Sequence, residues 1–315
     1  MCQTAHLSCP AITLFGMTAQ ALTPKAFVTL LFLACLFGAN HVAARVALDH
    51  GVDVTTAVAA RSLATALVVG LLVAWARIPV TLNSRQRRMM LAIGLLVTVQ
   101  SVWLYSSVAL IPVGLALLAF NTYPLWAAFA ILLLYKRVPQ RAVLIAMPII
   151  LFGLALALDV SGLATGLGAQ AQWDRIGAGV AYGIGAGAVF GMVLALTQHE
   201  VAELDGRLRS AITMSIVGVL ALAGALAQGG LHWPNAAAGW WGLLALSVLY
   251  GTAFTMLFTL LPKLGVVGNS PILNVEPVAA LGMAWLILDQ AVAPIQLVGA
   301  LLVVGTVMGL GLRRR

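Results

Sequence analysis

Glu276 is the residue with the clearest capacity for chemistry, because it lies within an apolar stretch, residues 268–290, that is long enough to cross a bilayer. A carboxylate at that depth costs on the order of a few kcal/mol unless it is paired, protonated or hydrated. We expect this carboxyl to bind a proton or the amine of a substrate. The alternative is a structural carboxyl that is protonated and hydrogen-bonded to a neighbouring helix.

Further polar side chains interrupt other apolar stretches. Histidine titrates in the physiological range, so Asn40-His41 could join the site or form an interhelical hydrogen bond. Arg61 could bind a substrate carboxylate through two hydrogen bonds, or extend its side chain to the outer membrane interface. Arg45 has Asp49 one helical turn further on, and we expect these two to pair.

Aromatic and amide side chains suit the wall of a small-molecule pocket. Trp103 and Tyr105 point to different faces of one helix, so the candidates cannot all line it. The candidates for this role are Gln100, Trp103, Tyr105, Asn121, Tyr123 and Asn274.

The arrangement around Glu276 occurs a second time, 153 positions earlier. Residues 121–124 correspond to residues 274–277, and each segment ends in proline. A proline inside a helix removes one backbone hydrogen bond, so we expect Pro124 and Pro277 to kink their helices. The polar residues that end the two stretches, Lys136 and Asp289, also correspond.

The composition is that of a polytopic membrane protein. Hydrophobic residues make up 62% of the 315 residues and charged residues only 8%, whereas soluble domains are near 25% charged. The net charge of +8 is spread between apolar runs and does not indicate a nucleic-acid surface. The three cysteines have no metal-ligand or disulfide spacing, and no P-loop or HExxH pattern occurs. We therefore expect no metal, no cofactor and no enzymatic activity.

Ten apolar runs, joined by short polar links, predict ten transmembrane helices. Residues 1–25 lack a signal-peptide layout and are expected not to span, although Met17 could be the true start. With the N-terminus in the cytoplasm, 14 of the 17 basic residues fall inside, which predicts that both termini are cytoplasmic. The runs are residues 26–48, 55–76, 90–110, 113–135, 142–158, 176–197, 210–228, 240–261, 268–288 and 295–312.

The two related stretches are runs four and nine, so the repeating unit has five spans. An odd-numbered unit re-enters the membrane from the opposite side, so the second half is inverted, as in many secondary transporters that bind substrate between their repeats. The predicted organisation is a tail (1–25), a first five-helix repeat (26–158), a linker (159–175), a second five-helix repeat (176–312) and a basic C-terminus (313–315).

The sixth run carries glycines four residues apart on one face. Small residues at this spacing let helices approach closely, which we expect of Gly179, Gly183, Gly187 and Gly191. A shorter series in run ten, Gly305 and Gly309, is a candidate homodimer face.

Over about residues 26–312, the order and spacing of several short motifs resemble those of the EamA family of the drug/metabolite transporter superfamily. The resemblance implies a ten-helix fold with a central cavity formed by spans one to four and six to nine, with spans five and ten peripheral. Family members move amino acids, other metabolites or toxic compounds, commonly outward. Their fourth and ninth spans usually end in glycine and glutamate, where this chain has Tyr135-Lys136 and Leu288-Asp289. The resemblance rests on Phe37-Gly38-Ala39-Asn40, Arg61-Ser62-Leu63, Tyr105, Pro112-Val113-Gly114, Pro124 and Glu276-Pro277.

We therefore expect a secondary transporter of the plasma (bacterial inner) membrane that exports a small amino-acid-like or otherwise amphipathic metabolite by alternating access. Its expected partners are this substrate, protons and the lipid bilayer, with no nucleic acid. One alternative is an uncoupled facilitative carrier of the same fold. Another is an integral membrane enzyme acting on lipids, which would need clustered His, Asp or Glu at one membrane face, and the sequence lacks such a cluster.

Overall fold

The computed structural model describes residues 24–138, 141–163, 165–260, 275–290 and 293–313, and the regular structure in these ranges is helical. The elements follow one another along the chain as single helices. They are α1 (Pro24–Asp49), α2 (Val54–Trp75), α3 (Ser84–Leu110), α4 (Val113–Phe120), α5 (Tyr123–Tyr135), α6 (Arg141–Ala157), α7 (Ala169–Glu200), α8 (Gly206–Ala227), α9 (Ala237–Leu260), α10 (Glu276–Leu288) and α11 (Pro294–Arg313).

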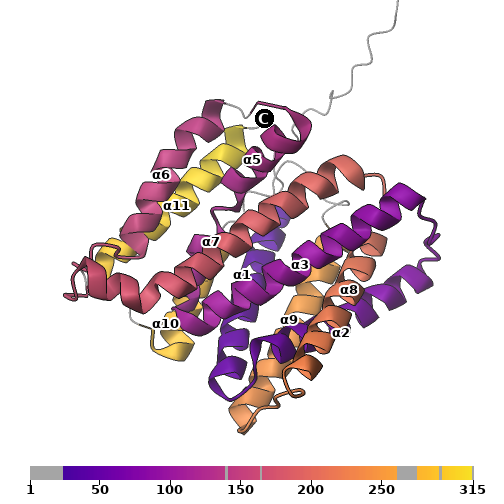
Figure 1. The fold of residues 1–315 in the computed structure, drawn as a ribbon, viewed down its shortest axis with the longest axis horizontal. Coiled ribbons are helices and arrows are strands. Elements are labelled where there is room, and N and C mark those ends of the chain that lie inside the picture. The colour runs from indigo at the N-terminus through magenta and orange to yellow at the C-terminus, as the bar shows by residue number, and fades with distance from the viewer. Residues whose placement is uncertain (1–23, 139–140, 164, 261–274, 291–292, 314–315) are drawn as a thin grey trace, which may run out of the picture.

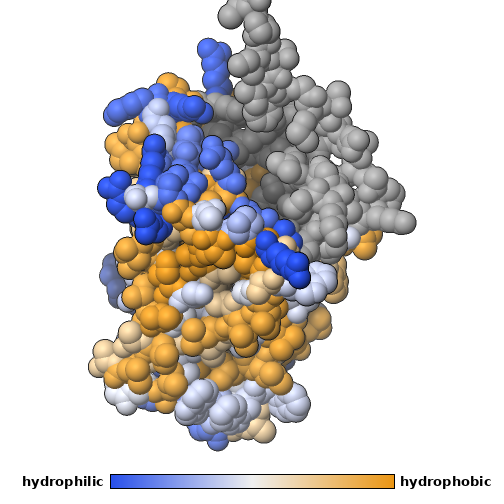
Figure 2. All heavy atoms as spheres, turned by 90° about the vertical axis from the view of Figure 1, so that its right-hand side faces the viewer, coloured by the Kyte–Doolittle hydropathy of each residue, from blue (hydrophilic) through white to orange (hydrophobic). Residues whose placement is uncertain are grey.

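Within the described residues, seven segments are long and apolar enough to cross a membrane, and α4 together with α5 counts as one of them. Three shorter apolar helices lie within α6, α10 and α11. They match predicted spans five, nine and ten, although residues 268–274 of span nine lie outside the described part. Figure 2 shows the surface that results, an apolar band between a strongly hydrophilic end and a second polar end.

Span four is broken where a kink was predicted. Helix α4 ends at Phe120 and α5 begins at Tyr123, with Pro124 in its first turn. Helix α10 also has its proline, Pro277, in its first turn. A proline costs little there, because the first N–H groups of a helix have no partner within the helix. Each proline therefore lies at a helix start and not in a helix interior.

The offset of 153 positions extends well beyond the two proline segments. It relates the first residues of three helix pairs, α3 and α9, α5 and α10, and α6 and α11. Lys136 and Asp289 also correspond, and both end their helices in the left-handed conformation, with φ of 54° and 51°. The second half thus follows the first without insertion or deletion over most of its length.

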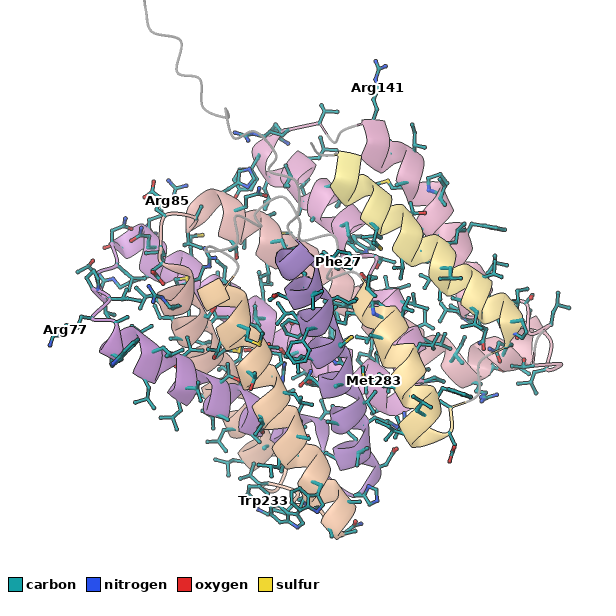
Figure 3. All side chains as sticks on the ribbon, turned by 180° about the vertical axis from the view of Figure 1, so that it is seen from behind. Phe27, Arg77, Arg85, Arg141, Trp233 and Met283 are labelled. Carbon is teal, nitrogen blue, oxygen red and sulfur yellow. The ribbon has the colours of Figure 1, made fainter. Side chains whose placement is uncertain are left out.

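Helix packing follows the same relation. The contact of α3 with α7 is matched by that of α9 with α1, and the contact of α5 with α7 by that of α10 with α1. Two further contacts join equivalent helices of the two halves, α2 with α8 and α6 with α11. Helices α6 and α11 lie side by side at one edge of the molecule (Figure 1). Basic residues Arg85 and Arg141 lie toward one end and Trp233 toward the other (Figure 3).

The glycine series of α7 faces the end of α3 and span four. A Cβ built on Gly179 would lie 2.5 Å from Ile111 Cγ2, and one on Gly187 would lie 2.7 Å from the Phe120 carbonyl oxygen, beside the α4–α5 break. A Cβ on Gly191 would lie 2.5 Å from the backbone nitrogen of Ala127 in α5. Gly183 meets Ala119 and Ser107. These glycines therefore let α7 lie directly against the α4–α5 backbone.

The corresponding contact in the other half involves Gly38 of α1. A Cβ at Gly38 would lie 3.0 Å from the backbone nitrogen of Ala280 in α10. Gly38 and Ala280 stand 153 positions from Gly191 and Ala127. The two halves therefore repeat one close backbone contact, α1 with α10 and α7 with α5.

Candidate functional site

Tyr105 of α3 lies at the centre of a buried polar cluster and is itself fully buried. Asn40 Nδ2 donates to its hydroxyl at 3.4 Å. The His41 ring lies 5.8 Å from the Tyr105 ring between centroids, and the guanidinium carbon of Arg61 lies 4.7 Å above that ring. Residues predicted separately on spans one, two and three are thus brought together on one tyrosine.

Arg61 is 4% exposed and is held between two tyrosine rings, since Tyr250 of α9 lies 4.0 Å from the guanidinium on the second side. Its Nη2 donates to Ser101 Oγ at 2.9 Å. Its Nε is buried without a hydrogen-bond partner, and no carboxylate among the described residues lies within ion-pairing distance. A buried cation without a counter-ion is costly, and the two tyrosine rings and Ser101 are the partners that the described residues offer Arg61.

Glu276 lies in the first turn of α10, where the helix dipole favours a negative charge. Its Oε1 is 3.1 Å from His41 Nε2, with 7% of the histidine side chain and 23% of the glutamate side chain exposed. Two buried atoms beside this contact, His41 Nδ1 and Asn40 Oδ1, have no hydrogen-bond partner among the residues that the structure describes. The close approach of α1 to α10 at Gly38 places His41, one turn further on, opposite Glu276.

Aromatic side chains of α1 and α9 flank the polar groups. Tyr250 contacts Phe254 at 4.5 Å between ring centroids, and Phe37 packs edge-on against both rings. Sequence reasoning missed Tyr250 and Ser101 as members of the cluster. A tyrosine within an apolar run and beside Gly251 is a signal for Tyr250, whereas a serine in a span gives none.

The polar residues of the cluster are not repeated at the equivalent positions of the other half. Phe37-Gly38 corresponds to Phe190-Gly191, but Asn40-His41 corresponds to Val193-Leu194. Likewise Arg61 corresponds to Met214, and Glu276 to Tyr123. The backbone packing is therefore repeated, whereas the ionisable groups occur once, with Arg61 and His41 from the first half and Glu276 from the second.

Comparison with known proteins is consistent with this architecture. The sequence model of the EamA-like transporter family matches residues 25–158 and 177–312, so two family units cover most of the chain. The chain belongs to the EamA-like transporter family. This membership confirms the predicted all-helical membrane fold with repeated halves. It also confirms the prediction that the protein is a transporter and not an enzyme.

The fold also resembles solved structures, fourteen of whose chains match. One, described as "Crystal structure of protein", has a TM-score of 0.60 and 16% sequence identity over 90% of this chain and 96% of its own. At that identity it supports the fold alone. No curated protein sequence matches this EamA-like chain.

Other predicted site residues of this EamA-like transporter lie away from the cluster. Trp103 is 37% exposed, and its ring covers Gly185 of α7. Tyr123 packs with Phe120 and Phe190. Asn121 is buried and donates from Nδ2 to the Leu117 carbonyl of its own helix. Asn274 lies outside the described residues.

Arg45 has the structural role that its spacing predicts. Its Nε donates to Asp49 Oδ1 at 2.9 Å, which confirms the expected pair. Its Nη1 donates at 2.7 Å to the Val108 carbonyl in the last turn of α3, where carbonyls lack partners within the helix. This arginine therefore joins α1 to the end of α3 and is not available for a ligand.

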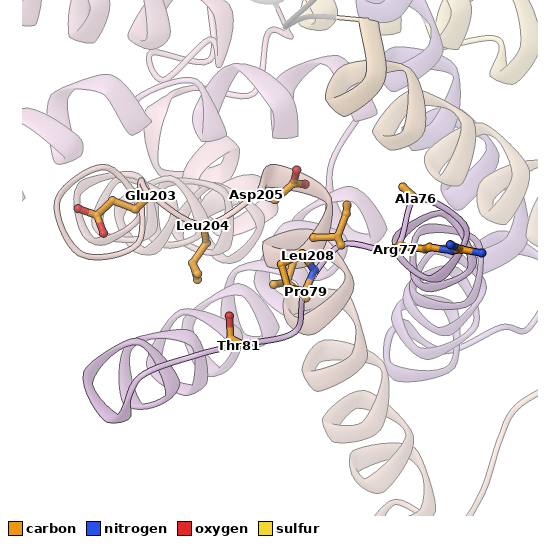
Figure 4. A pocket seen from close by; sticks show the side chains of 9 residues that line it. Ala76, Arg77, Pro79, Thr81, Glu203, Leu204, Asp205 and Leu208 are labelled. Carbon is orange, nitrogen blue, oxygen red and sulfur yellow. The ribbon is translucent and has the colours of Figure 1, made fainter.

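A groove lies at the basic end of the EamA-like transporter, between the α2–α3 linker and the α7–α8 turn (Figure 4). Its lining includes Arg77, Thr81, Glu203, Asp205 and Leu208. None of the predicted site residues lines it. The buried cluster around Tyr105 is therefore the better candidate for substrate binding.

Proposed function

We propose that this EamA-like transporter exports a small zwitterionic metabolite and exchanges it for a proton at Glu276. The observation that carries the proposal is the arrangement of charge around Tyr105, where the described residues give Arg61 no carboxylate within ion-pairing distance and Glu276 pairs with His41. A substrate anion bound to Arg61 would supply the missing negative charge.

The anionic end of the substrate would meet Arg61 at its free Nε, because a guanidinium binds a carboxylate through two N–H donors. The amine would replace His41 as the partner of Glu276, which a buried carboxylate requires. Phe37 and Phe254 would contact the apolar part of the substrate. Asn40 Oδ1 and His41 Nδ1, both buried and without a partner in the described part of the chain, would add hydrogen-bonding capacity beside it.

Proton exchange would follow from the same contact. In the proposed cycle, a proton shared by His41 and Glu276 neutralises the negative charge of the carboxylate while substrate is absent. When substrate binds, its ammonium group takes over this neutralisation and the proton can leave. One proton would thus be released for each substrate bound. The existing His41–Glu276 contact also supports the second candidate, an uncoupled carrier in which the pair is structural.

Efflux from liposomes tests the proposal. The full chain would be reconstituted into liposomes that are loaded with one amino acid from a panel. Parallel liposomes would be loaded with the matched amine that lacks the carboxylate, or with the matched acid that lacks the amine. Efflux would be followed with and without a proton gradient, for wild type, Glu276→Gln and the control Glu203→Gln, which changes an exposed carboxylate at the basic end.

We expect gradient-driven efflux of the zwitterion alone, lost in Glu276→Gln and retained in Glu203→Gln. Efflux indifferent to the gradient would identify the uncoupled carrier. Equal efflux from Glu276→Gln and wild type, with the same pH dependence, would remove Glu276 from the site.

A further inference from the structure

Glu200, the last residue of α7, binds two other helices at once. Its Oε2 accepts from Arg85 of α3, with distances of 2.9 Å to Nε and 2.7 Å to Nη2. Its Oε1 accepts from the Tyr135 hydroxyl at the end of α5, at 3.1 Å. Only 11% of the glutamate side chain is exposed. Both oxygens are therefore used, and one carboxylate ties α3, α5 and α7 together at the basic end of the molecule.

The Tyr135 ring is held from a second direction. It stacks on His199 with ring centroids 4.0 Å apart and an angle of 14° between planes. His199 Nδ1 lies 3.0 Å from the Ala195 carbonyl one turn earlier in α7. Tyr135 thus contacts α7 through its hydroxyl and through its ring.

The three residues of this cluster can be compared with the residues at the equivalent positions of the other half. At an offset of 153 positions, Glu200, Arg85 and Tyr135 correspond to Ala47 of α1, Ala238 of α9 and Leu288 of α10. The same three helices of the other half are also in contact, α1 with α9 and α1 with α10. Ala47 is fully buried, with its backbone against Gly242 of α9. The helix arrangement is repeated, but the charged contact exists in one half only.

We propose that Arg85, Glu200 and Tyr135 form a latch that holds α3, α5 and α7 together and biases the resting conformation toward closure of the basic end. Two repeated halves with equivalent backbones would otherwise open with similar free energies at the two ends. The latch makes them unequal, since its release separates an ion pair and a hydrogen bond, whereas its counterpart holds apolar side chains only. This inference goes beyond the proposed transport activity and needs no substrate.

Hydrogen exchange of the full chain in lipid nanodiscs, read by mass spectrometry, tests the latch. In Glu200→Gln we expect exchange to be about fivefold faster at the last turns of α5 and α7 and the first turns of α3, as suits a partly exposed ion pair. Tyr135→Phe keeps the ring stacked on His199 and should give a smaller increase that nevertheless reaches α7. Raising the salt concentration should speed exchange in wild type but not in Glu200→Gln.

The matched control is Arg87→Gln, which removes an exposed charge from the same turn of α3, where the Arg87 side chain donates to Ser84 of its own helix. We expect no change there. The charge-swapped pair Arg85→Glu with Glu200→Arg should restore slow exchange.

The proposal is overturned if Glu200→Gln exchanges like wild type, if its effect stays within α7, or if Arg87→Gln gives the same increase. If Glu200→Gln loosens the whole chain, α6 and α11 included, the charge-swapped pair decides, because failure to restore protection rejects the latch. None of these readings depends on transport, so the latch and the proposed function fail separately.

Discussion

Arg61 is a buried residue whose charge is expected to lower the stability of the folded protein. It is buried between Tyr105 and Tyr250, its Nη2 donates to Ser101, and it has no acidic partner in the described part of the chain. The repeat places Met214, an unbranched apolar side chain that is 3% exposed, at the corresponding position. A buried cation without an acidic partner costs free energy that a buried methionine does not, so stability alone does not account for Arg61, whereas the proposed anionic ligand would.

Arg61→Met, which copies the residue of the second half, separates stability from function. We expect transport to fall to background while the free energy of unfolding stays equal or rises by about 1–4 kcal/mol. Transport in liposomes and thermal unfolding in detergent measure the two effects, with Met214→Leu as the volume-matched control. A loss of about 3 kcal/mol or more in Arg61→Met would instead assign Arg61 a structural role.

Asp205 offers a pH-dependent test outside the membrane spans. Its carboxylate caps α8, accepting from the Arg207 N–H at 2.8 Å and from the Arg207 side chain. Hydrogen bonds from Arg207 outweigh burial and lower the pKa of Asp205 below its usual 3.8. Because the folded-state pKa is the lower one, the carboxylate stabilises the protein above pH 3.8, and this contribution is lost as the pH falls through the folded-state pKa.

We therefore expect Asp205→Ala to lower the free energy of unfolding by about 1 kcal/mol at pH 7 and by less at pH 3. Thermal unfolding at the two pH values measures the difference, with Asp174→Ala as a control, since Asp174 is exposed and accepts a hydrogen bond from Gln170 of its own helix. A pH-independent difference would show that the carboxylate charge does not stabilise the cap.

At the scale of elements, the close pairs α1–α10 and α7–α5 are the repeated structural unit. In each, a glycine lies against the backbone of the partner near the start of a short helix, Gly38 against Ala280 and Gly191 against Ala127. The partner helices α10 and α5 both have proline in their first turn. This packing places Glu276 beside α1 in one half and Tyr123 beside α7 in the other.

Gly191→Ala tests the close contact. Its Cβ would lie 2.5 Å from the Ala127 nitrogen, so α5 must move, and we expect a loss of about 1–3 kcal/mol with slower transport. Gly38→Ala should cost less, because its nearest backbone atom is 3.0 Å away. Thermal unfolding compares both with Gly70→Ala, where no atom lies within 4 Å. Equal stability of Gly191→Ala and Gly70→Ala would show that α5 and α7 are loosely packed.

At the scale of the whole molecule, the distribution of polar residues implies an orientation in the membrane. Arg77 and Arg85 lie toward one end and Trp233 lies at the other (Figure 3), and the positive-inside rule assigns the basic end to the cytoplasm. On this assignment, the latch faces the cytoplasm, and the α8–α9 turn faces outward.

Labelling of introduced cysteines tests this orientation. In a cysteine-free background, Trp233→Cys should react with a membrane-impermeant maleimide in intact cells, and Thr81→Cys should react only after the membrane is opened. Both positions are exposed and lie outside helices. The reverse pattern would invert the orientation and place the latch outside.

Much of the architecture could be predicted from the sequence, because its determinants are local. Twenty apolar residues in a row fix a span whatever they pack against, and a proline predicts an interruption of the helix, which the structure shows as the break between α4 and α5 at Pro124. The recurrence of residues 121–124 at 274–277 likewise identified two repeated halves. The pairing of Arg45 with Asp49 could be read directly, since one helical turn sets their distance.

The composition of the site was decided only by the tertiary structure. Arg61, Tyr105 and Tyr250 come from three helices, and nothing along the chain encodes which faces of these helices meet. Trp103 was a candidate of the same standing as Tyr105, yet helix rotation turns it toward Gly185 of α7, where it is 37% exposed. The Glu200 contacts with Arg85 and Tyr135 were invisible for the same reason. The sequence determines which segments cross the membrane, whereas helix packing decides which of their side chains meet.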